Sequence, residues 1–103
     1  MNRKEIAIEF AKNLKQKEIE KIILYGSVAR GDDNTDSDID ILIITENDDD
    51  EIKLSKNIYK TAFDFLLKTG EFISPKIFSK NHYKKYKHFS FYSNIDKEGV
   101  EIG

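Results

Sequence analysis

Two short apolar runs, separated by a glycine turn and a polar loop, constrain this chain more than any other feature. The runs cover residues 22–25 and 39–44, and both are rich in isoleucine. Short β-branched runs of this kind are typical of strands that are buried on both faces. Gly26 breaks the first run, and only Asp40 interrupts the second. We therefore expect two buried strands joined by a turn and a polar loop.

The residues before this stretch predict a helix. Asn2 followed by Glu5 has the pattern of a capping box, which begins many helices. Apolar residues recur behind it at helical spacing: Ile6, Phe10 and Leu14. We expect this first amphipathic helix to end near Gln16 and to serve for packing.

A longer helix is expected after the second apolar run. Asp48, Asp49 and Asp50 are acidic residues of the kind that favour a helix N-terminus. The apolar residues that follow form one stripe: Leu54, Ile58, Ala62, Phe65 and Leu66. Gly70 lies where a glycine commonly ends a helix.

The rest of the chain predicts two more strands and two short helical segments. Residues 72–78 have the pattern of a third strand, and Pro75 favours an edge or a bulge because proline cannot donate to a ladder. Ser79 can cap a short helix after this strand. The tail predicts a short helical turn followed by a fourth strand at residues 100–102.

This order of elements predicts an α/β or α+β fold with one mixed sheet of about four strands and helices mainly on one face. A length of 103 residues, 39% of them hydrophobic, suits one core, so we expect a single domain over residues 1–103. The absence of cysteine excludes disulfides and thiolate sites. The charged start and the short apolar runs predict a cytoplasmic protein without membrane contact.

The charges are distributed unevenly along the chain. Residues 32–51 carry ten acidic side chains and no basic one, whereas residues 52–103 carry ten lysines and five acidic side chains. An acidic block of this density either lies in solvent or binds cations. The basic remainder favours an anionic ligand or an acidic partner.

Asp38 and Asp40 are the candidate metal ligands. Residues two apart in a strand point to the same side, so these two carboxylates lie together while Ile39 and Ile41 point into the core. A carboxylate pair completed by water and substrate phosphates suits Mg²⁺. The alternative for an Asp-x-Asp pattern on its own is the solvated edge of a loop.

Gly26, Ser27 and Arg30 are the candidate nucleotide-binding residues. Glycine lets the backbone approach a ligand, and Ser27 at the start of a short helix offers its amide and hydroxyl to a phosphate. Arg30, one turn further on, can pair with phosphates as a bidentate fork. The alternatives are an ordinary capped turn and a surface arginine.

The joint spacing is more specific than either pattern. Gly26-Ser27, ten intervening residues and Asp38-x-Asp40 lie between two apolar runs, in LYGSVARGDDNTDSDIDILI. This stretch resembles the signature of the minimal nucleotidyltransferases of the DNA polymerase beta superfamily. The likeness is strong over residues 22–44 and looser elsewhere.

The resemblance implies a nucleotidyltransferase fold and a role for each candidate residue. Gly26, Ser27 and Arg30 would bind the triphosphate, and Asp38 and Asp40 would be catalytic and bind Mg²⁺. The family transfers a nucleoside monophosphate to a hydroxyl and releases pyrophosphate. Small members often act as antitoxins that adenylylate a helical HEPN toxin, so the resemblance implies Mg-ATP as substrate and a HEPN-type partner. The alternative is a weak or inactive antitoxin that neutralises its partner by binding.

One position departs from the family pattern. Active members usually supply a third carboxylate from the next strand, where this chain has Ser74 in the aligned position. Glu71 and Asp64 lie nearby in the sequence, and we interpret both as surface acids. Nucleotide binding is therefore better supported than catalysis.

Three other features concern partners. Bases and aromatics alternate in residues 80–89, as on a surface for single-stranded RNA, but an amphipathic helix with Tyr83 and Tyr86 inward explains this pattern better. We interpret His82 and His88 as surface residues without metal. An exposed sheet edge would allow a homodimer or a complex with the helical partner.

Overall fold

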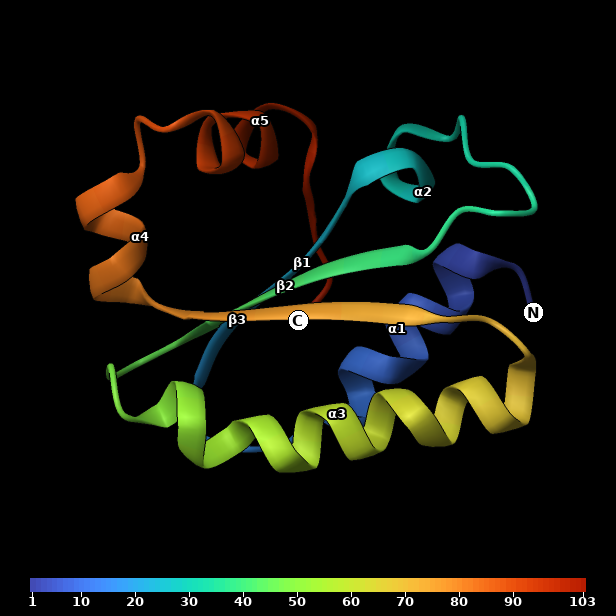
Figure 1. Ribbon diagram of the computed structural model, residues 1–103, viewed down its shortest axis with the longest axis horizontal. Helices are drawn as coiled ribbons and strands as arrows, with labels where there is room; N and C mark the ends of the chain where they lie inside the picture. Colours follow the sequence, from blue (N-terminus) through green and yellow to red (C-terminus); the bar gives the residue numbers. More distant parts are fainter.

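A computed structural model describes residues 1–103, which form a four-stranded sheet with helices on both sides (Figure 1). The helices are α1 (Arg3–Asn13), α2 (Gly26–Arg30), α3 (Asp50–Thr69), α4 (Lys80–Tyr86) and α5 (Ser90–Glu98). The strands are β1 (Ile19–Tyr25), β2 (Ile39–Thr45), β3 (Ile73–Ser79) and β4 (Val100–Glu101). The predicted α+β fold with a single mixed sheet is confirmed.

The sheet has the order β3-β2-β1-β4. Strand β1 runs antiparallel to β2 and β4, and β2 runs parallel to β3. Strand β2 lies between β1 and β3. Its second residue, Asp40, is in register with Tyr25 on β1 and with Ser74 on β3. Strand β3 is an edge strand, which is one of the two alternatives, an edge or a bulge, that Pro75 predicted.

The larger core lies between the sheet and the pair α1 and α3, on the lower side in Figure 1. Helix α1 contributes Phe10, whose ring meets that of Phe65 on α3 edge-to-face at 5.9 Å. Ile39 and Ile41 of β2 point into this core and are fully buried, as predicted. Burial of the apolar stripe on each helix is what holds the two layers together.

The opposite face of the sheet is partly covered by α4 and α5 (Figure 1). Leu42 and Ile44 of β2 pack there against Tyr92 and Ile95 of α5. This cluster contains four buried residues, compared with sixteen on the other side, so the helices do pack mainly on one face. A cleft remains between α5 and α2.

The ends of the helices follow the predicted signals in most cases. Asn2 and Glu5 form both hydrogen bonds of the capping box, and Gly70 ends α3 with φ 78°. Ser79 accepts a hydrogen bond from the backbone of His82 at the start of α4. Helix α1 ends at Asn13 and not near Gln16, because the chain turns toward β1 there.

The tail differs more from its prediction. In place of a short turn it forms the nine-residue helix α5, and β4 has two residues. His82 is also not a plain surface residue, since its Nδ1 lies 2.6 Å from the hydroxyl of Tyr92 and its ring stacks on Phe78. Phe91, Tyr92 and Ile95 of α5 have helical spacing, and Tyr92 and Ile95 are buried against Leu42 and Ile44 of β2.

The acidic run of residues 48–51, which spans the start of α3, makes specific hydrogen bonds. Asp48 accepts a hydrogen bond from the hydroxyl of Ser79 at 2.5 Å, and Glu51 accepts one from the Ser79 backbone at 2.7 Å. Asp50 is buried and accepts from the backbone of Asn47. These bonds fix the start of α3 against the end of β3.

None of the five helices is both long and apolar enough to cross a membrane.

Candidate functional site

A cleft of about 380 Å³ opens where β1 passes into α2. One wall consists of the turn after β1 with Arg30, the floor includes Asp40 of β2, and the other wall is the inner side of α5. The lining residues are Tyr25, Gly26, Ser27, Arg30, Asp40, Phe91, Asn94, Ile95 and Glu98. The structure thus brings four of the five predicted site residues together in one cleft.

Gly26 is the residue that allows this turn. Its φ of 77° lies in the left-handed region that glycine adopts without penalty. A Cβ atom placed on Gly26 would overlap the Oδ2 atom of Asp40. The close contact between the turn and the carboxylate therefore requires glycine for its conformation and for its size.

Asp38, the fifth predicted residue, lies just before β2 and is exposed, whereas Asp40 is half-buried within the strand. Burial raises the pKa of Asp40 above its usual value, and the charge of Asp38 raises it further. The positive charges of Lys76 and Arg30 act in the opposite direction. Two carboxylates at this spacing repel each other, and a bound cation would relieve that repulsion.

Tyr25 faces this carboxylate and stays protonated. Burial, and after it the charge of Asp40, raise the pKa of Tyr25 to about 12. Its ring meets the ring of Phe91 edge-to-face at 5.8 Å between centroids. Tyr25 thus joins the floor of the cleft to the wall on α5.

The donor set fits one Mg²⁺ ion held by Asp38 and Asp40. Magnesium keeps several waters and binds through one or two carboxylates plus substrate phosphates. Asp40 lies in the cleft beside the turn at Gly26, and Asp38 lies just before β2, two residues away in the chain. No group of three or more histidine, cysteine or acidic side chains lies close enough to hold a metal. A second ion would therefore depend on substrate oxygens for its ligands.

The position of a third carboxylate is occupied by Ser74. The parallel register of β2 and β3 pairs Asp40 directly with Ser74. Glu71 is bound instead to Arg3, with its Oε2 atom 2.7 Å from the guanidinium Nε. Asp64 forms an ion pair with Lys60 on the surface of α3 at 3.2 Å. Asp64 is a surface acid, as predicted, whereas Glu71 is half-buried in its ion pair with Arg3.

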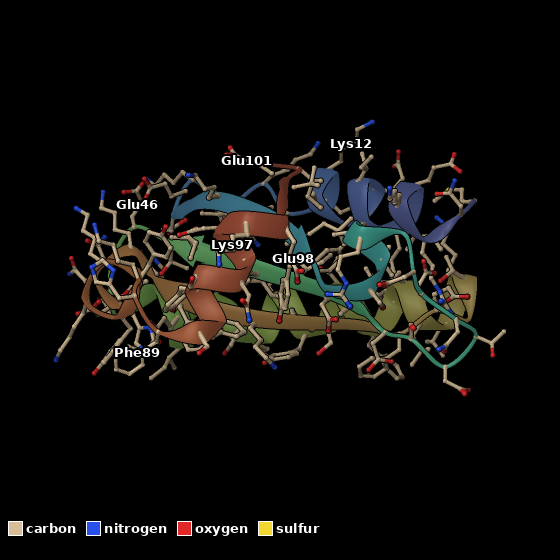
Figure 2. All side chains as sticks on the ribbon, turned by 90° about the horizontal axis from the view of Figure 1, so that it is seen from above. Lys12, Glu46, Phe89, Lys97, Glu98 and Glu101 are labelled. Carbon is tan, nitrogen blue, oxygen red and sulfur yellow. The ribbon has the colours of Figure 1, made fainter.

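Arg30 lines the cleft but already has partners. Its Nη1 atom donates to Glu98 on α5 at 3.0 Å, and its Nε atom donates to Asp32 at 3.2 Å. The hydrogen bond to Asp32 is the main reason that the pKa of Arg30 is raised. A phosphate that binds Arg30 has to compete with these two carboxylates. Figure 2 shows Glu98 on α5 beside α2.

The wall on α5 was not foreseen from the sequence. Phe91, Asn94 and Glu98 follow one another at spacings of three and four, which places them on one face of a helix. If residues 90–98 had been predicted as a helix, that spacing would have indicated that the three residues share one face. The sequence did not indicate that this face meets the turn at Gly26.

Arg3 was also not foreseen. Its guanidinium donates to Asp33 at 3.0 Å, to the carbonyl of Asn34 and to the carbonyl of Thr35 at 3.2 Å. Through Glu71 the same side chain reaches the segment before β3. Arg3 thus holds the loop that leads to Asp38. Nothing local to Arg3 in the sequence indicates these contacts.

Comparisons with known proteins bear on the family and the fold of this chain. Residues 7–97 match the family described as nucleotidyltransferase domain. Two relatives from Methanocaldococcus jannaschii carry the names "Putative protein adenylyltransferase MJ0604" and "Putative protein adenylyltransferase MJ0141". The first is 38% identical over 102 residues, covering 96% of both chains, and the second is 36% identical over 101 residues, covering 95% and 96%.

Two solved structures have a similar fold. One is a toxin–antitoxin crystal structure with AMP-PNP, with a TM-score of 0.57 and 17% identity over the whole of this chain and 73% of that one. The other is the Y104A mutant of the toxin–antitoxin MntA-HpeT, with a TM-score of 0.55 and 16% identity over the whole of this chain and 72% of that one. At this identity the likeness concerns the fold.

Proposed function

Since the chain belongs to the nucleotidyltransferase domain family and is of its minimal type, we propose that it transfers AMP from Mg-ATP to a hydroxyl of a partner protein. The single observation that carries the proposal is the cleft in which Gly26, Ser27 and Asp40 come together. The names of the relatives favour adenylyl transfer, and the AMP-PNP of the first structural neighbour favours ATP.

Each residue of the cleft has a role in this proposal. Gly26 lets the backbone approach the triphosphate, and Ser27 offers its amide and hydroxyl to phosphate oxygens. Arg30 turns from Glu98 and Asp32 toward the same phosphates, to which a guanidinium binds as a fork. Asp38 and Asp40 would hold Mg²⁺, which when bound stabilises the negative charge that develops on the phosphates.

The transfer forms one bond to the α-phosphorus and breaks another. The acceptor hydroxyl oxygen forms a bond to the α-phosphorus, the bond from that phosphorus to the bridging oxygen breaks, and pyrophosphate leaves. The hydroxyl proton passes to solvent water, since Ser74 stands where a third carboxylate would accept it. The residues of the chain therefore contribute mainly positioning and charge stabilisation.

We place the partner against the outer side of α3 and the edge strand β3. Tyr59, Phe63 and Leu67 of α3 are all more than half exposed, as is Phe72 before β3. Tyr59, Phe63 and Phe72 line an apolar groove of about 340 Å³ along the edge. Exposed apolar side chains of this number favour an interface. We propose a helical HEPN-type toxin as the partner and this chain as its antitoxin; a homodimer is the other possible occupant.

One observation favours a second candidate function. Ser74 beside Asp40 leaves the metal site with two carboxylates, so the chain can act as a nucleotide-binding antitoxin that neutralises its partner by forming a complex. In that case binding of the partner, and not transfer, would protect the cell. The two candidate functions differ in whether Asp38 and Asp40 are needed to neutralise the partner.

The test is incubation with labelled ATP, Mg²⁺ and the protein encoded by the neighbouring gene. We expect label on that protein, and no label with the double variant Asp38→Asn/Asp40→Asn. Transfer that persists in this variant would overturn the enzyme proposal. If transfer is absent and the double variant still neutralises the partner in cells, the binding function is the correct one. Asp64→Asn, which alters a surface acid outside the cleft, is the matched control.

A further inference from the structure

We infer that the α5 wall of the cleft is the subsite for the nucleotide base, with Phe91 as its stacking surface and Asn94 as the residue that selects adenine. The inference rests on the proposed function, because it assumes that the phosphates bind at the turn of Gly26. It extends that function by naming the residues that decide which nucleotide is used.

The cleft has the phosphate-binding candidates on one wall and Phe91 with Asn94 on the other. The phosphate-binding candidates lie on the turn after β1 and on α2, whereas Phe91 and Asn94 lie across the cleft on α5. Figure 2 shows α5 with Glu98 at the end near α2 and Phe89 at the other end. A nucleotide with its phosphates at Gly26 therefore has α5 as the surface available to its base.

Phe91 is held rigidly enough to serve as a stacking surface. It is half-buried, and its ring makes edge-to-face contacts with Tyr25 at 5.8 Å and with Phe78 at 6.2 Å between centroids. These neighbours fix the ring while part of it lines the cleft. Stacking on an aromatic side chain accepts any base, because every base has a π-face. Phe91 therefore supplies affinity without selection.

Asn94 supplies the selection. It lies one helical turn after Phe91, is exposed, and lines the same cleft. A carboxamide presents one donor and one acceptor side by side, which matches the amino group and a ring nitrogen on the edge of adenine. The corresponding edge of guanine presents two acceptors, and the amide oxygen would be opposed to one of them.

The other α5 residues that line the cleft, Ile95 and Glu98, are less suited to recognise a base. The carboxylate of Glu98 is bound to Arg30 at 3.0 Å. Ile95 is buried against β2 and offers no polar atom. Asn94 is thus the remaining side chain on α5 with a donor and an acceptor at the cleft.

The experiment compares three ligands by isothermal titration calorimetry with Mg²⁺ and the full chain: ATP, GTP and inorganic tripolyphosphate. We expect ATP to bind at least about tenfold more tightly than tripolyphosphate, which lacks the base that Phe91 stacks on. Phe91→Leu should weaken ATP binding by about tenfold and leave tripolyphosphate binding unchanged. Asn94→Ala should remove the preference for ATP over GTP.

Two control variants match these changes. Asn57→Ala alters an exposed asparagine on α3, on the other side of the sheet, and Phe89→Leu alters an exposed phenylalanine outside the cleft. Both should bind all three ligands as the unchanged chain does. Asn94 is exposed, so Asn94→Ala keeps the test decisive even where Phe91→Leu impairs folding.

The outcomes separate the two proposals. Equal affinity for ATP and GTP in the unchanged chain, or unchanged ATP affinity and preference in Phe91→Leu and Asn94→Ala, would overturn the base subsite. The proposed function would survive that result as long as Asp38→Asn/Asp40→Asn still abolishes transfer. Failure of the unchanged chain to bind either ATP or tripolyphosphate would overturn the phosphate site, and the base subsite with it.

Discussion

The carboxylate of Asp40 occupies the space that a side chain on Gly26 would need. Gly26 begins α2 and Asp40 lies on β2, and their contact joins the proposed phosphate turn to the proposed metal ligand. We expect Gly26→Ala to lower AMP transfer by about 100-fold, because it displaces one of two groups that must be aligned. Transfer assays with labelled ATP measure this effect.

Gly31→Ala is the matched control for that variant. Gly31 has almost the same positive φ, 81°, but nothing lies within 4 Å of its missing Cβ. It should cost about 1–2 kcal/mol in stability for the strained backbone and retain transfer. Equal loss of transfer in both variants would mean that backbone strain, and not the contact with Asp40, causes the effect.

Glu98→Gln should strengthen nucleotide binding. Glu98 holds the Nη1 atom of Arg30 at 3.0 Å, and removing its charge releases the guanidinium for phosphate. Because the pair is partly exposed, we expect the Kd for ATP to fall by only about two- to fivefold. Glu101→Gln, which removes a carboxylate paired with Lys21 at the other side of β1, should leave the Kd unchanged. Weaker ATP binding in Glu98→Gln would show that Glu98 assists the site.

Ser74→Asp should increase transfer. The register of β2 and β3 places residue 74 beside Asp40, so an aspartate there supplies the third carboxylate that this chain lacks. A general base that accepts the hydroxyl proton typically accelerates a reaction at least about 100-fold, and we expect a rate increase of at least about tenfold from an introduced base. Single-turnover rates with saturating Mg-ATP provide the measurement. No gain would mean that another step limits the reaction.

Asp40→Asn should stabilise the fold at neutral pH while abolishing transfer. The pKa of Asp40 is raised by burial first and by Asp38 second, so the folded chain binds this proton more tightly than the unfolded chain. The unchanged protein therefore loses stability as the pH rises from the usual carboxylate pKa to the raised one, and the variant lacks this loss. Urea unfolding between roughly pH 3.5 and pH 7, the range around a carboxylate pKa, compares the stability of the two proteins. A lower stability of the variant at pH 7 would contradict the prediction.

Arg3→Lys should loosen the loop before Asp38. Lysine keeps the charge but cannot reproduce the fork that reaches Asp33, the carbonyl of Thr35 and Glu71. We expect faster proteolysis within residues 32–38 and weaker Mg²⁺-dependent binding of ATP. Lys4→Arg, at an exposed neighbouring position, is the control. Unchanged proteolysis in Arg3→Lys would show that the loop does not depend on Arg3.

Local patterns were sufficient for most of the fold. The apolar runs predicted β1 and β2, and the stripe before Gly70 predicted α3. Pro75 predicted an edge or a bulge, and β3 is an edge strand. These signals are readable because each depends on residues a few positions apart. The length of the helix in the tail was underestimated, because the apolar residues of α5 pack against Leu42 and Ile44, which lie on a strand far away in the sequence.

The sequence alone determined the spacing of the turn, Arg30 and the carboxylate pair, and it predicted that Ser74 would align with them. The tertiary structure decided what surrounds these residues. Glu98 and Phe91 reach the cleft from α5, and Arg3 reaches the loop from α1. The Arg30–Glu98 and Arg3–Glu71 contacts each join residues 68 positions apart. Contacts of that range form only when the sheet brings distant segments together, so no local periodicity records them.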